Sequence, residues 1–261
     1  MKLLRSDFDL DQFFHDLGRA PQRLLLLDYD GTLAPLRRER DQAVPYPGVA
    51  ERLAALAATA GTRLAVVSGR PAEEVEGLLG MRPAPEIWGC HGLERLRPGR
   101  ALERDAVAPA TRRALDAAEA WARERGLAPH LERKPASLAL HWRGLDAAEI
   151  ASLTRAAIAA WPRGDGLAIQ PFDGGLELRA AGVDKGRAVA ALLAESPPDA
   201  AVAFLGDDRT DEDAFAALPP GGLAVLARSR LRPTRAQLWL RPPEELLEFL
   251  ERWREAERGA A

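Results

Sequence analysis

The chain has 261 residues, of which 47% are hydrophobic, so it can form one large domain or two modest ones. Its 36 basic and 39 acidic residues leave a net charge of -3, which offers no general attraction for nucleic acid or anionic lipid. Cys90 is the only cysteine, which excludes an intramolecular disulfide, and no apolar run approaches the ~20 residues of a membrane span. Charge interrupts the N-terminal segment too early for a secretory signal. We therefore expect a cytoplasmic monomer that binds neither nucleic acid nor membrane.

The beginning of the chain alternates apolar runs with helical patterns. Residues 24–27 are four leucines bounded by Pro21 and Gly31, which predicts a strand buried on both faces. The alternation continues with a helix over 48–60, a strand over 63–67, a helix over 71–79 and a short strand at 87–88. This βαβαβ order predicts a parallel sheet.

The pattern changes near Ala106. Helices are expected over 110–125 and 146–161, and strand patterns occupy residues 131–134, 137–142, 167–170 and 175–179. Two helices and four strands in this order predict a small α+β unit with an open sheet. We place this insertion at residues 108–181, between core segments 1–107 and 182–261.

The α/β alternation resumes after the insertion. The expected elements are a helix over 185–194, a strand over 201–205, a helix over 211–217, strands over 223–226 and 238–240, and a last helix from Pro243. The predicted fold class is therefore α/β, with a Rossmann-like parallel-sheet core and an inserted α+β domain.

Polar residues follow four of the predicted core strands. They are Asp28 with Asp30, Ser68 with Arg70, His91, and the group Asp207, Asp208 and Asp211. The carboxyl ends of parallel strands meet at one edge of a sheet, so these side chains should converge. Carboxylates from two strands can share Mg²⁺, whereas a single cysteine cannot build a thiolate zinc site. With Lys185, a hydroxyl and the N–H groups of Gly31 and Thr32 around that cation, the cluster predicts phosphoryl transfer.

Each of these features also has an ordinary structural explanation. Asp28 and Asp30 can cap an Asp-Gly turn, and Ser68 can cap the helix that begins at Pro71. Lys185 can be a solvated lysine at a helix start, and residues 207–212 can form an acidic helix N-terminus. An adjacent pair of aspartates at the end of a buried strand is nevertheless costly without a cation, which favours the metal site.

The set of motifs resembles the haloacid-dehalogenase-like (HAD) phosphatases. The matching segments are Asp28-Tyr29-Asp30-Gly31-Thr32, Ser68-Gly69-Arg70, Lys185 and the stretch 206–212. The resemblance implies that Asp28 attacks phosphorus, and that Asp30 protonates the leaving oxygen and then activates water.

The same resemblance implies the metal and phosphate ligands. Mg²⁺ would be held by Asp28, the main-chain carbonyl of Asp30 and Asp207, with Asp208 and Asp211 completing or orienting the shell. Gly31, Thr32, Ser68 and Lys185 would hold the phosphoryl oxygens.

The insertion corresponds to the family's cap domain, which closes over the site and recognises the leaving group. Its stretch 131–143 resembles the cap signature of trehalose-6-phosphate phosphatases, and the segments 89–94 and 175–179 agree with that family. The resemblance implies that Glu132, Lys134 and Glu177 bind the disaccharide hydroxyls, with Arg70 and His91 as further substrate contacts. Without the resemblance, the three cap residues are ordinary exposed strand residues and His91 is a structural histidine.

The expected function is hydrolysis of trehalose 6-phosphate through an aspartyl-phosphate, with Mg²⁺ as cofactor and a sugar phosphate as the small-molecule partner. The nearest alternative is a phosphatase for another sugar phosphate, such as sucrose 6-phosphate or a glucosyl- or mannosylglycerate phosphate. A catalytically idle sugar-phosphate-binding regulator, the phosphatase-like half of a synthase complex and a phosphomutase remain as further alternatives. Intact Asp28, Asp30, Lys185 and Asp207 count against loss of activity.

Overall fold

The computed structural model describes residues 1–261 except 38, 60, 162–163, 165 and 260–261. The chain divides into two compact units, one formed by Met1–Glu103 with Asp184–Ala261 and the other by Arg104–Val183. We call them the core unit and the inserted unit. Within the described residues, no helix combines the length and apolar character that a membrane span needs.

The core unit contains a mixed sheet whose order is β1-β13-β12-β11-β2-β3-β4-β5-β6. Its strands are β1 (Lys2–Leu3), β2 (Arg23–Leu27), β3 (Thr62–Val67), β4 (Glu86–Gly89), β5 (Glu94–Leu96), β6 (Glu103–Arg104), β11 (Ala201–Gly206), β12 (Leu223–Ala227) and β13 (Leu238–Leu240). The run from β13 to β4 is parallel, as predicted. The edges differ, because β1 and β5 pair antiparallel with their neighbours.

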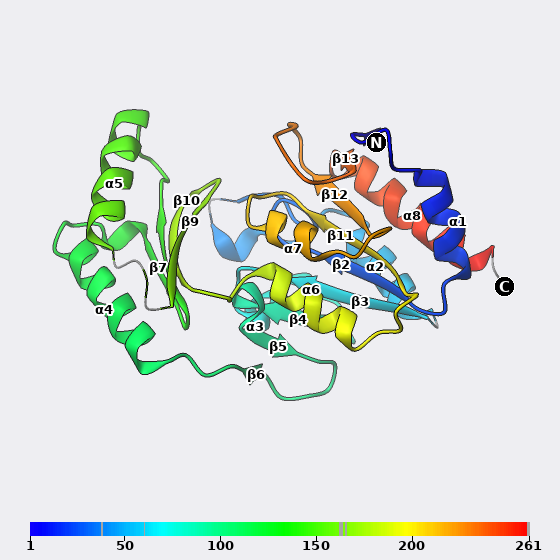
Figure 1. Cartoon of the computed structure of the whole chain (residues 1–261), viewed down its shortest axis with the longest axis horizontal. Coiled ribbons are helices and arrows are strands. Elements are labelled where there is room, and N and C mark those ends of the chain that lie inside the picture. The colour runs from blue at the N-terminus through cyan, green and yellow to red at the C-terminus, as the bar shows by residue number, and fades with distance from the viewer. Residues whose placement is uncertain (38, 60, 162–163, 165, 260–261) are drawn as a thin grey trace. The chain divides into compact units, whose positions relative to one another are not determined.

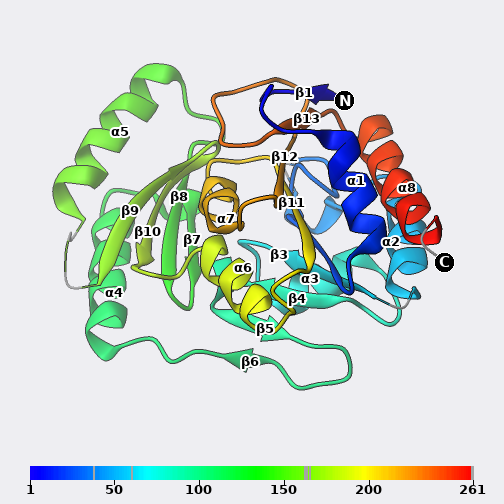
Figure 2. The ribbon, with the colours of Figure 1, turned by 45° about the vertical axis from the view of Figure 1, so that its right-hand side comes forward.

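Helices cover both faces of this sheet (Figures 1 and 2). They are α1 (Leu10–Arg19), α2 (Val49–Ala57), α3 (Ala72–Leu79), α6 (Lys185–Ala194), α7 (Asp211–Ala217) and α8 (Glu244–Arg258), with single 3₁₀ turns η1 (Arg40–Gln42) and η2 (Cys90–Gly92). The bounds of α6 and α7 are those predicted. The helix predicted over 48–60 is α2, which ends at Ala57, and the predicted end at residue 60 lies outside the described residues.

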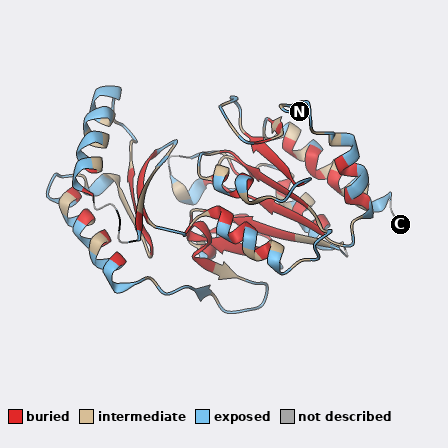
Figure 3. Cartoon of the chain, viewed as in Figure 1, coloured by how far each residue is buried: buried red, intermediate tan, exposed pale blue. Residues whose placement is uncertain are grey.

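The four leucines of β2 explain why this strand lies at the centre. Leu25 and Leu27 pack with apolar residues of α1, α2, α3 and α8, whereas Leu24 and Leu26 pack with those of α6 and α7. Successive side chains of a strand point to opposite faces, so a strand covered on both faces must be apolar throughout. Burial is dense along the central strands (Figure 3). The sheet therefore holds the end of β2 rigidly, where the first aspartate lies.

The inserted unit is a four-stranded antiparallel sheet of order β7-β8-β10-β9 with two helices. Its elements are α4 (Pro109–Arg123), a 3₁₀ turn η3 (Ala128–His130), β7 (Leu131–Lys134), β8 (Ser137–His141), α5 (Ala147–Ala160), β9 (Leu167–Phe172) and β10 (Gly175–Ala180). Leu138, Leu140, Leu176 and Leu178 form its core with residues of α4 and α5. The alternate positions of β7, β8 and β10 carry most of the unit's charged strand residues, among them Glu132, Lys134, Glu177 and Arg179, on the face opposite its helices.

Candidate active site

Three neighbouring strands of the core sheet end at the candidate site. β11, β2 and β3 are adjacent and parallel, and Asp207, Asp28 and Ser68 follow them directly. The Asp28 N–H donates to the Leu205 carbonyl at 2.8 Å, so the backbones of β2 and β11 stay in register up to the aspartate. The pairing of the strands thus places side chains that lie far apart in sequence at one sheet edge.

Asp28 is held by two donors. Lys185 Nζ, on the first residue of α6, lies 2.6 Å from Asp28 Oδ1 and 2.7 Å from Asp211 Oδ1. The Thr32 hydroxyl donates to the other oxygen, Asp28 Oδ2, at 3.1 Å. Asp28, Lys185 and Asp211 are all buried, so charge-assisted bonds in this site are only weakly screened by water.

Three carboxylates crowd together around that lysine. Asp28, Asp207 and Asp211 each offer an oxygen within 4.8 Å of the others. Burial raises the pKa of Asp28 to about 7; Asp211 and Asp30 add to the rise, and Lys185 opposes it.

Burial also raises the pKa of Asp207 well above its usual range, and the charges of Asp28, Asp211 and Asp208 add to the effect. Burial alone would lower the pKa of Lys185, but the two carboxylates it contacts outweigh burial and raise it. Negative charge exceeds what one ammonium group neutralises. This buried set of oxygen donors therefore fits a hard divalent cation.

Two glycines allow this crowding. A Cβ at Gly31, where φ is +81°, would lie 2.0 Å from Asp207 Oδ2, and one at Gly206 would lie 2.2 Å from Asp211 Cγ. Any side chain at either position would displace a carboxylate. The Asp-Gly sequence after β2 is therefore needed for the approach of two strand ends as well as for a turn.

Two predicted ligands are engaged elsewhere. The Gly31 N–H donates to the Ala34 carbonyl at 2.7 Å, so in this structure it is committed to the turn rather than directed at a phosphoryl group. Asp208 Oδ1 accepts the Arg209 N–H at 2.6 Å, and its own N–H donates to Asp211 Oδ2 at 2.9 Å. Asp208 is not part of the carboxylate cluster found among the described residues, and it orients Asp211 through its backbone.

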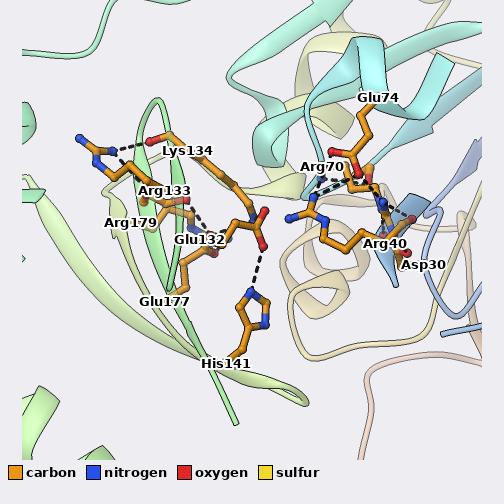
Figure 4. Close-up of polar contacts among 12 residues, drawn as sticks. Asp30, Arg40, Arg70, Glu74, Glu132, Arg133, Lys134, His141, Glu177 and Arg179 are labelled. Carbon is orange, nitrogen blue, oxygen red and sulfur yellow. Dashed lines mark hydrogen bonds and ion pairs between the residues drawn. The ribbon is translucent and has the colours of Figure 1, made fainter. Parts of the chain in front are cut away.

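Arg70, which is predicted to contact the substrate, pairs with residues of the core in this structure. Its Nε lies 2.6 Å from Asp30 Oδ2 and its Nη2 lies 2.7 Å from Asp30 Oδ1 (Figure 4). Its Nη1 donates to the Arg40 carbonyl at 2.9 Å and also pairs with Glu74. Arg70 is buried, and a buried guanidinium needs such partners. The structure therefore assigns its donors to the core itself.

His91 lies in a left-handed turn behind Ser68. Cys90 and His91 have φ values of 49° and 58°, which non-glycine residues rarely adopt. The His91 N–H donates to the Ser68 carbonyl at 2.9 Å, and a Cβ at Gly69 would lie 2.7 Å from the His91 ring. His91 is buried, so this histidine packs the two loops together, and its substrate contact remains a proposal.

The Ser68 hydroxyl can cap the following turn and still bind a phosphoryl oxygen. Its Oγ accepts the Arg70 N–H at 3.1 Å, in the manner of a turn cap. A hydroxyl that accepts one bond still has a proton to donate. The side chain is buried at the end of β3 and can serve both roles.

The inserted unit has a separate polar network on its strand face (Figure 4). Lys134 Nζ lies 3.5 Å from Glu132 Oε1 and 3.4 Å from Glu177 Oε1. The Ser137 hydroxyl donates to Glu177 at 2.7 Å, and His141 Nε2 lies 2.9 Å from Glu132 Oε2. The side chains of Glu132, Lys134 and Glu177 are only 18%, 11% and 3% exposed, so they are not ordinary solvated strand residues.

Several participants of these networks are not among the predicted site residues. Glu74 stands four residues after Arg70, a spacing at which an ion pair can be expected once a helix start is assigned. Ser137 and His141 gave no such signal, because their contacts depend on strand pairing. The register places Ser137 opposite Lys134 and Arg179, and it places Glu177 opposite Ala139, two residues further along on the same face.

Comparison with known proteins identifies the family of this chain. The sequence model of the family described as Trehalose-phosphatase matches residues 26–230. The chain belongs to the trehalose-phosphatase family. The family predicted from the motifs is therefore confirmed. The matched residues 26–230 include the carboxylate cluster and the whole inserted unit.

Individual relatives point the same way. A trehalose-phosphate phosphatase of Mycobacterium marinum is 32% identical over 259 residues, which cover 92% of this chain and 65% of the relative. The chain thus spans about two thirds of the length of that relative. Among solved structures, Aspergillus fumigatus trehalose-6-phosphate phosphatase has a TM-score of 0.70 at 25% identity, covering 97% of this chain and 98% of that one. A HAD-superfamily phosphatase of Bacteroides thetaiotaomicron, BT1666, has a TM-score of 0.64 at 14% identity, covering 98% and 100%, which confirms the fold class.

Proposed function

We propose that the protein hydrolyses trehalose 6-phosphate to trehalose and inorganic phosphate through an aspartyl-phosphate on Asp28. The observation that carries the proposal is the buried cluster in which Asp28 contacts Lys185 beside Asp207 and Asp211, in a chain of the trehalose-phosphatase family. A nucleophile held by a lysine and a hydroxyl, next to a cation site, is the arrangement that phosphoryl transfer needs.

The reaction proceeds in two displacements. An oxygen of Asp28 forms a bond to phosphorus while the bond from phosphorus to the sugar oxygen breaks, and Asp30 gives its proton to that oxygen. Water then attacks phosphorus, Asp30 takes a proton from it, and the bond between Asp28 and phosphorus breaks to release phosphate. Lys185 and Ser68 stabilise the charge that develops on the phosphoryl oxygens.

We assign Mg²⁺ to the cluster, with Asp28, Asp207, Asp211 and the carbonyl of Asp30 as the residues that would hold it. Its hard oxygen donors and excess negative charge support this choice. Bound Mg²⁺ supplies positive charge next to the phosphoryl group. Asp208 acts by orienting Asp211.

We assign recognition of the sugar to the inserted unit. Glu132, Lys134 and Glu177 present charged acceptors and donors on one sheet face, and sugar hydroxyls bond to such groups more strongly than to neutral ones. His141 contacts Glu132 and would hold its carboxylate on the polar face of the sheet.

We also propose that the protein is a monomer and that it acts in the cytoplasm, since a single cysteine fits a reducing compartment. Light scattering on the purified protein tests the monomer.

A phosphate-release screen tests the function. The panel includes trehalose 6-phosphate, sucrose 6-phosphate, glucose 6-phosphate, glucosylglycerate phosphate and 4-nitrophenyl phosphate, each with Mg²⁺ and with a chelator. We expect Mg²⁺-dependent release with the highest kcat/KM for trehalose 6-phosphate. A higher value for another sugar phosphate would transfer the proposal to that substrate, and binding without phosphate release would favour a regulator. Transfer of phosphate to a second sugar hydroxyl would favour a mutase.

A further inference from the structure

The carboxylate of Asp30 is held at two points by one guanidinium. Arg70 Nε and Nη2 lie 2.6 Å and 2.7 Å from its two oxygens, so both oxygens accept from the same planar group. The Asp30 side chain is 31% exposed, whereas that of Arg70 is 7% exposed. A partly solvated carboxylate without these contacts would exchange between staggered positions about its first side-chain torsion and rotate broadly about its second.

Arg70 is itself fixed by contacts on its other side. Its Nη1 donates to the Arg40 carbonyl and pairs with Glu74 of α3, and its guanidinium carbon lies 5.9 Å from the centre of the Tyr29 ring. Its backbone is tied as well, since its N–H donates to Ser68 Oγ and its carbonyl accepts the Cys90 N–H at 2.7 Å. These contacts fix the position of the guanidinium, so the orientation of the Asp30 carboxylate depends on Arg70 and not the reverse.

We infer that Arg70 is a positioning residue that sets the orientation of the Asp30 carboxylate. This inference rests on the proposed function, in which Asp30 serves as the acid and base. Every nitrogen of the Arg70 side chain has an acceptor within the core, so the residue acts through Asp30 rather than by binding the sugar. The planar fork of arginine can grip both carboxylate oxygens, whereas lysine offers a single point of contact.

The inference predicts a pattern across substrates. Protonation of the leaving oxygen matters for a sugar alcohol and matters little for 4-nitrophenolate, which is a good leaving group. A misplaced Asp30 should therefore slow trehalose 6-phosphate hydrolysis and spare the first, rapid release of 4-nitrophenolate. A residue that only stabilises the fold would reduce both to a similar extent.

A double-mutant cycle tests the inference. We expect Asp30→Asn to lower kcat for trehalose 6-phosphate by roughly 10²–10⁴-fold, the range of general acid-base catalysis, and Arg70→Met to lower it by roughly 10–100-fold. KM should change less than about twofold, because Arg70 does not touch the substrate. Arg70→Lys should recover part of the loss. The double variant should be no slower than Asp30→Asn alone, since Arg70 then has nothing left to position.

The controls separate positioning from stability. Methionine retains the apolar stem of Arg70, and the side chains of Asp30 and Glu74 are 31% and 32% exposed, so water can solvate them after the change. If Arg70→Met does not fold, the cycle is run with Arg70→Lys. Arg63→Met removes another partly buried arginine, which pairs with Glu86 and Glu195 outside the site, and should leave kcat unchanged.

The outcomes distinguish this inference from the proposed function. Three results would overturn the positioning role: additive losses in the double variant, a rise in KM alone, or a loss in the first release of 4-nitrophenolate equal to the loss in trehalose 6-phosphate turnover. Wild-type protein that cleaves 4-nitrophenyl phosphate but no sugar phosphate would count against the proposed substrate. In that case the cycle is measured on steady-state turnover of 4-nitrophenyl phosphate, where Asp30 is still needed to activate water, and it decides the role of Arg70 there.

Discussion

The two units hold their buried charges in opposite ways. In the core unit, Asp28, Asp207 and Asp211 share one lysine, and burial together with mutual repulsion raises the pKa of two of these carboxyls. In the inserted unit, Glu132 and Glu177 share Lys134, while Ser137, His141 and Arg179 supply further contacts. The first cluster has excess negative charge, and the second is close to balanced.

This difference indicates what each cluster can bind. Buried carboxylates that outnumber the positive charges around them repel one another, and a bound cation lowers that repulsion. The same cation can then attract a phosphoryl group. A balanced network gains nothing from an ion, but it offers oriented donors and acceptors to neutral hydroxyls. The core cluster is therefore suited to the reaction and the inserted cluster to recognition, and five predictions test this difference.

The largest effect is expected at Asp28. Asp28→Asn keeps the shape of the side chain but removes the nucleophilic oxygen charge, so kcat should fall by roughly 10⁴–10⁶-fold for every substrate. Phosphate release and trapping of the phosphorylated enzyme measure this, and Asp9→Asn in the N-cap of α1 serves as a control away from the site. Substantial turnover by Asp28→Asn would contradict the assignment of the nucleophile.

The next effect concerns the inserted unit alone. Glu132→Ala or Lys134→Ala removes a charged hydrogen-bonding group, so kcat/KM for trehalose 6-phosphate should fall by roughly 10²-fold. Hydrolysis of 4-nitrophenyl phosphate, which has no sugar, should stay within a few fold of wild type. Arg123→Ala on the exposed side of α4 is the matched control. Equal losses for both substrates would mean that these residues support the unit rather than recognise the sugar.

The unbalanced cluster also predicts a pH dependence of cation binding. The pKa of Asp28 in the cation-free protein is about 7, above the value of 3.8 for an unperturbed aspartate. A cation needs ionised carboxylates, and the pKa of Asp207 is raised as well, so the affinity for Mg²⁺ should rise with pH through the range around 7, by about tenfold per unit or more. Calorimetry on either side of that pKa measures the affinity and the proton released. A flat affinity profile would show that Asp28 is already ionised without the cation.

The same pKa sets the sign of a stability effect. Between the two values the folded, cation-free protein binds more protons than the unfolded chain does. Its stability should therefore fall as pH rises through this window, and Asp28→Asn should remove that contribution.

The sequence predicted the elements around the site better than the contacts within it. The strand β2 could be predicted because burial on both faces requires an apolar run. The helix α6 could be predicted because its first residues and its apolar spacing leave a local pattern. The helix α1 was missed, although Asp9 as N-cap and buried Phe13, Phe14 and Leu17 on one face are local signals for it. The Arg70 pair with Asp30 has no local signal, because it joins residues 40 positions apart across the ends of two strands.

The smallest effect is a pair of opposite shifts in stability, measured as thermal unfolding with a chelator present. Asp207→Asn keeps the volume of the side chain while removing one of the crowded charges, so the cation-free protein should become more stable by roughly 1 kcal/mol. Glu177→Gln removes the charge that faces Lys134 and Arg179, so the protein should lose about 1–3 kcal/mol. Both substitutions exchange a buried carboxylate for an amide of the same shape, and only the balance of charge around them differs. If both variants shift in the same direction, the contrast between the two clusters fails, because local packing rather than charge balance would then govern their stability.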